Sequence, residues 1–224
     1  MPFVDRTDAG RKLAKALASY KGQKPIVMAL PRGGVPVAAK IAEALNAPLD
    51  LILVRKIGVP FQPELAMGAV VDGAAPLTVR NEEVITLADI SEQEFAAARD
   101  RELAEIERRR KLYLGDRPHP ELAAHTVIVV DDGIATGATT RAALQAMRQC
   151  SPSKLVLAVP VAPTDTLRKL SGEADDLVCL EDYEHFGAIG LFYSDFRQVS
   201  DAEVIELLAR HPVKQQPALK KAAS

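Results

Sequence analysis

Short runs of consecutive apolar residues alternate along this chain with longer segments in which apolar residues recur every three or four positions. A continuous apolar run is typical of a buried parallel strand, whereas the wider spacing is typical of a helix with one buried face. The apolar runs predict strands over residues 25–30, 49–54, 65–71, 77–80, 127–130, 154–161 and 176–180. The periodic segments predict helices over residues 5–20, 35–45, 91–114, 164–170 and 201–210. Strands alternating with helices indicate an α/β fold, with helices on both faces of a mainly parallel sheet.

Two segments before residue 115 add detail to this pattern. Residues 57–64 contain Gly58, Pro60 and Pro63, so they predict a loop. Ser91 and Glu94 have the spacing of a capping box, which predicts the start of the long helix over 91–114.

The composition restricts the class of protein. The chain of 224 residues is long enough for one large domain, and its 28 Lys and Arg nearly balance its 30 Asp and Glu, giving a formal charge of −2. This balance and the absence of Trp argue against nucleic acid or an acidic membrane surface as a partner. Cys150 and Cys179 have no C-x-x-C spacing and indicate a reducing compartment. Because the sequence shows no apolar leader and no membrane-length apolar run, we expect a cytoplasmic protein.

The stretch that follows the apolar run at 127–130 carries the most chemistry. Asp131 and Asp132 come directly after this predicted strand, and Thr136-Gly137-Ala138-Thr139-Thr140 leads into a helix. Free N–H groups, hydroxyl donors and a glycine at a helix start suit a phosphate, whereas adjacent acids suit sugar hydroxyls or Mg²⁺. The stretch is neither a Walker A loop nor a dinucleotide-binding G-x-G-x-x-G loop. The simpler alternative is that these residues only cap a turn and a helix.

Two more polar loops follow predicted strands. Pro31-Arg32-Gly33-Gly34 follows the strand at 25–30, and Arg55-Lys56 ends the strand at 49–54. Because ligands in such sheets bind beyond the carboxyl ends of the strands, we expect all three loops to face one crevice. Arg32 adds a fork of donors to the N–H groups of two glycines, which suits a second phosphate group. The alternatives are a tight glycine turn at the first loop and a solvated charge pair at the second.

The stretch 127–140 resembles the phosphoribosyl-diphosphate (PRPP) motif of type I phosphoribosyltransferases. The resemblance extends to other segments, namely Asp5-Arg6, Leu30-Pro31-Arg32-Gly33-Gly34, Val54-Arg55-Lys56 and Phe192-Tyr193-Ser194-Asp195-Phe196. Together they are similar to a group of bacterial phosphoribosyltransferases whose acceptor is unassigned. The resemblance implies the type I phosphoribosyltransferase fold with a small C-terminal hood. It also implies Mg²⁺-dependent transfer of 5-phosphoribose from PRPP to a nitrogenous base or related acceptor, with release of pyrophosphate.

The resemblance assigns expected roles to individual residues. Asp131 and Asp132 would contact the ribose hydroxyls and are the side chains nearest to any Mg²⁺, which PRPP and water would largely hold. The residues expected to bind the 5′-phosphate are Thr136, Gly137, Ala138, Thr139 and Thr140. The residues expected to bind pyrophosphate are Arg32, Gly33, Gly34, Arg55 and Lys56. The expected catalytic set is Asp131, Asp132, Arg32 and Lys56, and residues 57–64 resemble the mobile loop that closes over the reaction.

One position departs from the purine-salvage branch of the family. The residue before Thr-Gly, an acid in hypoxanthine/guanine enzymes, is Ala135 here, and a methyl group cannot transfer a proton. The orotate branch also lacks this acid, so the resemblance then implies an anionic acceptor or another proton carrier. The expected acceptor residues lie in the hood and are His185, Phe186, Phe192 and Tyr193. The alternative is that these aromatic side chains only pack against the edge of the sheet.

We expect a single domain over residues 1–211, with a helical insertion at about 84–115, a hood at about 181–200 and a flexible tail over 212–224. The expected partners are PRPP, a small nitrogenous acceptor and a second copy of the chain in a homodimer. An alternative function is a non-catalytic regulator that senses PRPP or a nucleotide on the same fold, and another is a binding protein or hydrolase for a phosphoribosyl metabolite. The formal charge of −2 counts against a regulator that binds nucleic acid.

Overall fold

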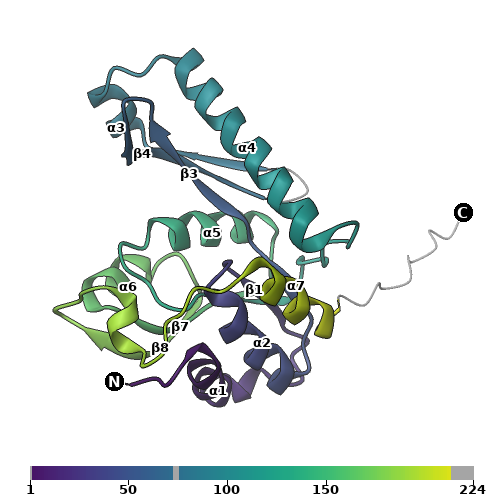
Figure 1. Ribbon diagram of the computed structural model, residues 1–224. Helices are drawn as coiled ribbons and strands as arrows, with labels where there is room; N and C mark the ends of the chain where they lie inside the picture. The colour runs from purple at the N-terminus through teal and green to yellow at the C-terminus, as the bar shows by residue number, and fades with distance from the viewer. Residues whose placement is uncertain (1, 73–75, 213–224) are drawn as a thin grey trace, which may run out of the picture.

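The computed structural model describes residues 2–72 and 76–212. A parallel sheet with the strand order β2-β1-β6-β7-β8 lies at its centre (Figure 1). Its strands are β1 (Ile26–Ala29), β2 (Leu49–Leu51), β6 (Thr126–Val130), β7 (Lys154–Pro163) and β8 (Asp176–Tyr183). All neighbouring strands of this sheet pair in parallel, as the sequence predicts. The tail expected over 212–224 lies outside the described residues apart from residue 212.

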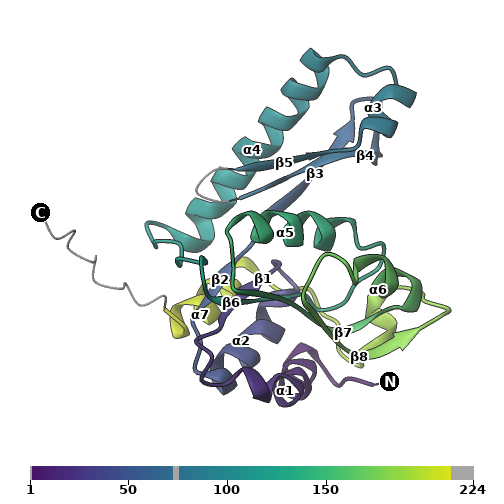
Figure 2. The same ribbon diagram turned by 180° about the vertical axis from the view of Figure 1, so that it is seen from behind.

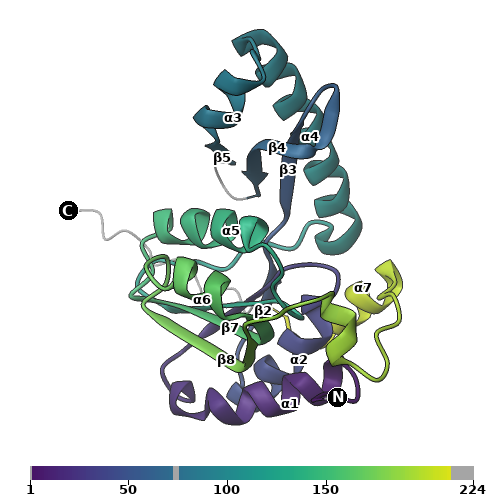
Figure 3. The ribbon, with the colours of Figure 1, turned by 90° about the vertical axis from the view of Figure 1, so that its left-hand side faces the viewer.

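Helices cover both faces of the central sheet (Figures 2 and 3). On one face lie α1 (Arg6–Ala16) and α2 (Gly34–Leu45), and on the other lie α5 (Ala138–Gln149) and α6 (Thr164–Leu170). Every residue of β1 and β6 is buried, because both strands lie between the two helical layers. Burying a Val or Ile side chain contributes about 1.5–3 kcal/mol, which explains why these strands are continuous apolar runs. The predicted α/β fold is confirmed.

A second unit, the arm (residues 54–114), projects from the central sheet between β2 and β6 in the chain (Figure 1). Its antiparallel strands are β3 (Val54–Val59), β4 (Gln62–Val71) and β5 (Leu77–Arg80), and its helices are α3 (Glu82–Leu87) and α4 (Glu92–Leu114). The helical segment expected at 84–115 therefore lies within a larger unit that begins with β3. The capping box of Ser91 and Glu94 at the start of α4 is confirmed.

The prediction of a loop over residues 57–64 is wrong, because these residues belong to the hairpin of β3 and β4. Pro60 lies in the tight turn of this hairpin. Gly58 lies where the pairing register shifts, against the backbone of Pro63. A β-bulge accommodates a proline because the ladder is locally interrupted there. The three residues that indicate a loop thus mark the turn and the bulge of a hairpin.

The C-terminal part of the chain returns to the core after β8. It contains the short helix η2 (Ile189–Phe192) and the helix α7 (Asp201–Arg210), which packs against α2 and α4. The predicted helix at 201–210 is confirmed, whereas the helix expected at 5–20 ends at Ala16 and is followed by η1 (Ala18–Tyr20). Within residues 2–72 and 76–212, no helix has both the length and the apolar character that crossing a membrane requires.

A buried cluster of polar side chains lies at the base of the arm. Asp50 of β2 has no exposed surface, and its Oδ2 atom is 3.2 Å from Nδ1 of His119, which follows α4. Nε2 of His119 accepts a hydrogen bond from Nε of Arg110 (3.1 Å) and lies 3.8 Å from Oδ2 of Asp72. The hydrogen bond to Asp50 raises the pKa of His119, although burial and Arg110 act in the opposite direction.

We expect this cluster to make the stability of the fold depend on pH. Because the pKa of His119 is higher in the folded state, its contribution is complete below the unfolded-state value of about 6.5 and is lost as pH rises through the folded-state pKa. The free energy of unfolding, measured by urea titration, should therefore fall as pH rises from about 6 to about 8. A His119→Gln variant should lack this part of the slope and be about 1–3 kcal/mol less stable at low pH. Identical slopes in the two proteins would contradict the assignment.

Candidate functional site

Two glycines bring the loop after β1 into contact with the residues after β6. Leu30 donates its N–H to the carbonyl of Val130 (2.9 Å), so the two chain segments run side by side as they leave the sheet. A Cβ atom added at Gly33 would lie 2.0 Å from Oδ2 of Asp132, and one added at Gly34 would lie 3.0 Å from Cα of Asp131. Residues 31–34, here called the 31–34 loop, therefore lie directly against Asp131 and Asp132, here called the acid pair. The peptide bond between Pro31 and Arg32 is cis.

The two members of the acid pair have different surroundings. Oδ1 of Asp131 accepts a hydrogen bond from the N–H of Asp132 (2.8 Å), and burial and the charge of Asp132 raise the pKa of Asp131 well above its usual value. Asp132 instead accepts a hydrogen bond from Nε of Arg6 at Oδ2 (2.7 Å). Its backbone carbonyl accepts another from the hydroxyl of Tyr193 (2.6 Å). Of the two acids, it is therefore Asp132 that pairs with the positively charged side chain of Arg6.

Arg6 is the site residue to which the sequence assigns no role. Its side chain and that of Asp132 are each 11% exposed, so their ion pair is largely shielded from water. The Arg6 guanidinium lies 3.9 Å from the centre of the Phe196 ring and donates to the carbonyl of Arg197 (2.8 Å). The N-terminal helix and the C-terminal segment therefore meet at Asp132. The Asp5-Arg6 and Phe-Tyr-x-Asp-Phe segments of the family pattern are the signals that point to this contact.

Residues 136–140, here called the 136–140 loop, span the start of α5, since residues 138–140 form the first turn of the helix. Gly137 precedes the helix with a φ of 78° and has no side chain that could cap the first turn, so the N-terminus is open. A Cβ at Gly137 would lie 2.8 Å from Cγ2 of Thr166, so the residue type also reflects close packing. Thr136, Ala138 and Thr139 are exposed, whereas Thr140 is only 3% exposed. Unpaired N–H groups beside an exposed hydroxyl form a site suited to a phosphate.

Arg32 lies in the 31–34 loop, but its guanidinium is turned toward α7. Its Nη1 atom lies 3.5 Å from Oδ1 of Asp201, the first residue of that helix. The same oxygen accepts a hydrogen bond from the hydroxyl of Tyr113, at the end of α4 (2.5 Å). This hydrogen bond lowers the pKa of Asp201, and burial and the bond raise the pKa of Tyr113 to about 12.

Arg55 and Lys56 lie at the start of β3 in the arm, not at the end of the strand before it. The structure ends β2 at Leu51. Nε of Arg55 is 2.7 Å from Oε2 of Glu102 on α4, and Nζ of Lys56 is 2.9 Å from Oε2 of Glu64 on β4. These pairs are partly or largely exposed, and such pairs contribute at most about 1 kcal/mol, so a ligand can replace them.

The aromatic residues expected to bind the acceptor mainly contact one another. The Phe192 ring is stacked on Phe186 with centroids 4.8 Å apart and lies 4.7 Å from Tyr183. Tyr193 is only 2% exposed and packs between Phe3 (5.3 Å) and Phe196 (5.0 Å). This differs from the expectation of a Tyr193 ring available for stacking.

Two other residues singled out by the sequence lie at the surface. His185 of the hood is exposed. Ala135, which replaces the acid of the purine-salvage branch, is also exposed. Thr166 of α6 donates its hydroxyl to the Ala135 carbonyl (3.1 Å), which holds the residue before Thr136 against that helix.

Few side chains near the acid pair could act as ligands for a metal ion. In the part of the chain that the structure describes, no three His, Cys, Asp or Glu side chains are grouped as ligands for an ion. Oδ1 of Asp131 and Oδ2 of Asp132 already accept hydrogen bonds from within the protein. Mg²⁺ readily keeps water and phosphate oxygens as ligands, so the acid pair fits an ion that is carried mainly by its ligand.

Sequence comparison identifies related proteins across nearly the whole chain. The phosphoribosyl transferase domain family matches residues 6–197. A Mycobacterium tuberculosis (strain H37Rv) protein, provisionally named phosphoribosyl transferase Rv0571c, is 45% identical over 208 residues. The match covers 93% of this chain and 46% of that protein, so the chain spans about half the length of the curated relatives it matches.

Structure comparison agrees with the sequence comparison. The protein TT1426 from Thermus thermophilus is similar with a TM-score of 0.78 and 40% identity, over 95% of this chain and 100% of that one. The AQ2163 protein from Aquifex aeolicus has a TM-score of 0.52 at 13% identity, over 93% and 87% of the two chains, which shows a shared fold alone. The chain therefore belongs to the phosphoribosyl transferase domain family and has the type I phosphoribosyltransferase fold.

Proposed function

We propose that this protein binds PRPP and transfers its 5-phosphoribosyl group to a nitrogenous acceptor, releasing pyrophosphate. The observation that carries this proposal is the contact between the 31–34 loop and the acid pair, which residues 133–137 connect to the open N-terminus of α5. The 136–140 loop binds the 5′-phosphate, the acid pair binds the ribose hydroxyls, and the 31–34 loop binds pyrophosphate. This order matches a sugar that carries phosphate at one end and pyrophosphate at the other.

Magnesium fits this arrangement as an ion bound mainly to PRPP and water. The acid pair retains carboxylate oxygens that can face such an ion, and oxygen ligands are those that Mg²⁺ prefers. When bound, the ion neutralises charge on the leaving pyrophosphate. The protein's own contribution is to fix the ribose through Asp131 and Asp132.

Three basic side chains are proposed to stabilise the leaving pyrophosphate. Arg32 belongs to the 31–34 loop itself. Its Nη1 atom lies 3.5 Å from Oδ1 of Asp201. Arg55 and Lys56 belong to the arm, so they reach pyrophosphate only if the arm approaches the site or if they come from a second copy in a homodimer. The positive charge of all three side chains matches the charge that develops in the transition state.

The residue at position 135 restricts the kind of acceptor that the protein can use. With Ala135 in place of an acid, the protein provides no proton carrier at that position. An acceptor that arrives as an anion needs none, and exposed His185 is another group that can exchange a proton. The absence of an acid at position 135 also favours the second candidate function, which is a regulator that binds PRPP without transferring its phosphoribosyl group.

PRPP with Mg²⁺ should raise the melting temperature, because a ligand that binds only the native state stabilises it. Thr139→Ala removes an exposed hydroxyl next to the open N-terminus of α5 and should weaken PRPP binding by about tenfold. The matched control is Thr86→Ala, which removes an exposed hydroxyl from α3 of the arm. Calorimetry should show weaker binding in the first variant and wild-type binding in the control. No thermal shift at millimolar PRPP in the wild type would refute PRPP binding.

Pyrophosphate release separates the two candidate functions. PRPP, Mg²⁺ and the protein are incubated with a panel of anionic and neutral bases, and released pyrophosphate is measured. We expect release with an anionic base and little release with its neutral analogues, since Ala135 cannot supply a proton. Binding of PRPP without release across the panel would favour the regulator.

A further inference from the structure

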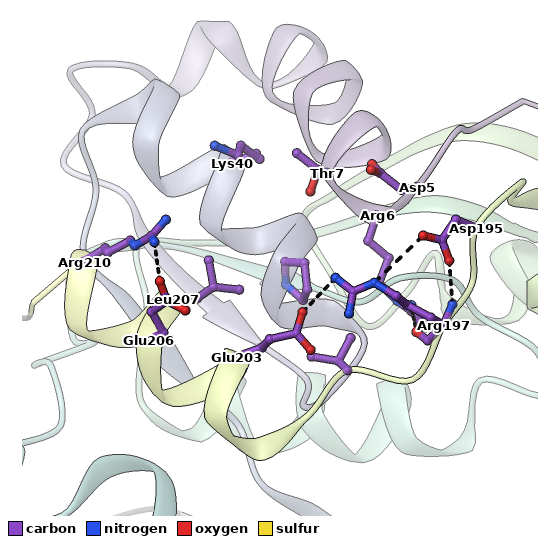
Figure 4. A pocket seen from close by; sticks show the side chains of 12 residues that line it. Asp5, Arg6, Thr7, Lys40, Asp195, Arg197, Glu203, Glu206, Leu207 and Arg210 are labelled. Carbon is purple, nitrogen blue, oxygen red and sulfur yellow. Dashed lines mark hydrogen bonds and ion pairs between the residues drawn. The ribbon is translucent and has the colours of Figure 1, made fainter.

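A cavity of about 210 Å³ lies between the N-terminal end of α1, the helix α2, the segment at 195–199 and α7 (Figure 4). Arg6 lines this cavity and also bonds to Asp132, so one guanidinium borders both the cavity and the acid pair. Pro36, Val199 and Leu207 give the cavity apolar walls. A volume of this size holds a small organic molecule, and its apolar walls suit a carbon skeleton.

Cationic side chains lie at two ends of the cavity. Arg6 and Arg197 lie together at one end, and Lys40 and Arg210 lie at the other (Figure 4). Their guanidinium and ammonium groups have more N–H donors than their observed partners use. Arg210 bonds to Glu206 and Lys40 bonds to Glu43, each through one nitrogen.

The four acidic residues that line the cavity all accept hydrogen bonds from the protein, and one of them, Glu206, is the partner of Arg210. Asp5 accepts the N–H of Asp8 as the cap of α1, and Asp195 accepts the N–H of Arg197. Glu203 completes the capping box at the start of α7, and the hydrogen bond from the Ser200 backbone and the Arg197 guanidinium lower its pKa to about 2. These acids are therefore bound locally, and the cationic side chains keep N–H donors beyond those that these contacts use.

We propose that this cavity binds a small organic anion with an acidic group at each end and an apolar body between them. One acidic group contacts Arg6 and Arg197, and the other contacts Lys40 and Arg210. Guanidinium groups bind carboxylates through paired, charge-assisted hydrogen bonds, which are the strong ones.

Binding in this cavity also affects the acid pair, a consequence that rests on the proposed function. Nε of Arg6 donates a hydrogen bond to Oδ2 of Asp132. In the proposed function, the ribose hydroxyls of PRPP would also bond to this oxygen. An anion that draws Arg6 toward the cavity frees this oxygen, so PRPP should bind more tightly. By thermodynamic linkage, PRPP then tightens anion binding by the same factor.

The cavity is tested by calorimetry on the full chain at low salt without PRPP, using benzene-1,4-dicarboxylate, benzoate and benzamide as probes. We expect the dicarboxylate to bind about tenfold more tightly than benzoate, and benzamide not to bind measurably. Arg197→Gln and Arg210→Gln should each weaken dicarboxylate binding by about tenfold. Arg148→Gln is the matched control, since Arg148 forms an exposed pair with Asp175 and does not line the cavity. Equal binding of the three probes, or unchanged binding in both cavity variants, would overturn the proposal.

The link to PRPP is tested separately. A saturating concentration of the dicarboxylate should lower the Kd for PRPP several-fold in the wild type and leave it unchanged in Arg197→Gln. An unchanged or higher Kd in the wild type would overturn the link through Arg6. Failure of PRPP to bind without any anion would instead refute the proposed function, while the probe series still decides whether the cavity binds anions.

Discussion

A Gly33→Ala variant should bind PRPP about a hundredfold more weakly than the wild type, or not at all, while keeping the fold. The added Cβ would lie 2.0 Å from Oδ2 and 2.5 Å from Cγ of Asp132, so the carboxylate must move. The Tyr193 hydroxyl fixes the backbone of Asp132 and Arg6 holds its Oδ2 atom, so the carboxylate cannot move away without breaking its hydrogen bond to Arg6. The effect comes from this contact and not from the backbone, because the φ and ψ of Gly33 are −61° and −36°, which alanine adopts readily.

Gly172→Ala is the matched control for this substitution. A Cβ added at Gly172 meets no atom of residues 2–72 and 76–212 within 4 Å, so PRPP binding and the melting temperature should match the wild type. Calorimetry with PRPP and Mg²⁺ measures the first quantity, and thermal denaturation without ligand measures the second. Wild-type PRPP affinity in Gly33→Ala would show that the 31–34 loop and the acid pair do not bind one ligand together.

The second large effect concerns the ion pair of Arg6 and Asp132, for which we expect a coupling free energy of about 2–3 kcal/mol. Both side chains are 11% exposed, so either single substitution leaves a poorly solvated charge without its partner. Arg6→Met and Asp132→Asn should each destabilise the fold strongly, and the double variant should lose much less than the sum of the two. Urea denaturation of the four proteins gives the coupling directly.

Lys56 and Glu64 provide a control cycle with similar geometry and different burial. Their atoms are 2.9 Å apart, but their side chains are 50% and 93% exposed. Exposed pairs of this kind usually couple by less than about 1 kcal/mol. Equal coupling in the two cycles would mean that burial does not strengthen the Arg6–Asp132 pair, and that Arg6 is held mainly by Phe196 and the Arg197 carbonyl.

The parts of the site that the sequence predicts well are local in the chain. The strand, the acid pair and the start of α5 are contiguous over residues 127–140, so their spacing alone defines their arrangement. The contact between Gly33 and Asp132 follows from a general property of parallel sheets, because β1 and β6 are neighbours and both loops leave the same edge.

The parts that the sequence does not predict depend on long-range packing. Arg6 reaches Asp132 across 126 positions, and Tyr193 reaches its carbonyl across 61. The predicted position of Arg55 and Lys56 is wrong for a different reason. The apolar run at 49–54 continues through buried residues after β2 has ended at Leu51. A run of apolar residues indicates that the segment is buried, but it does not show where one sheet ends and another begins.

The carboxylate of Asp201 lies where three parts of the molecule meet. Its Oδ1 atom receives the Tyr113 hydroxyl from the end of the arm and lies 3.5 Å from the Arg32 guanidinium of the 31–34 loop. This one oxygen atom therefore connects the 31–34 loop, the start of α7 and the end of α4. A substitution at Asp201 removes both contacts at once, so it alters the surroundings of the loop and the base of the arm together.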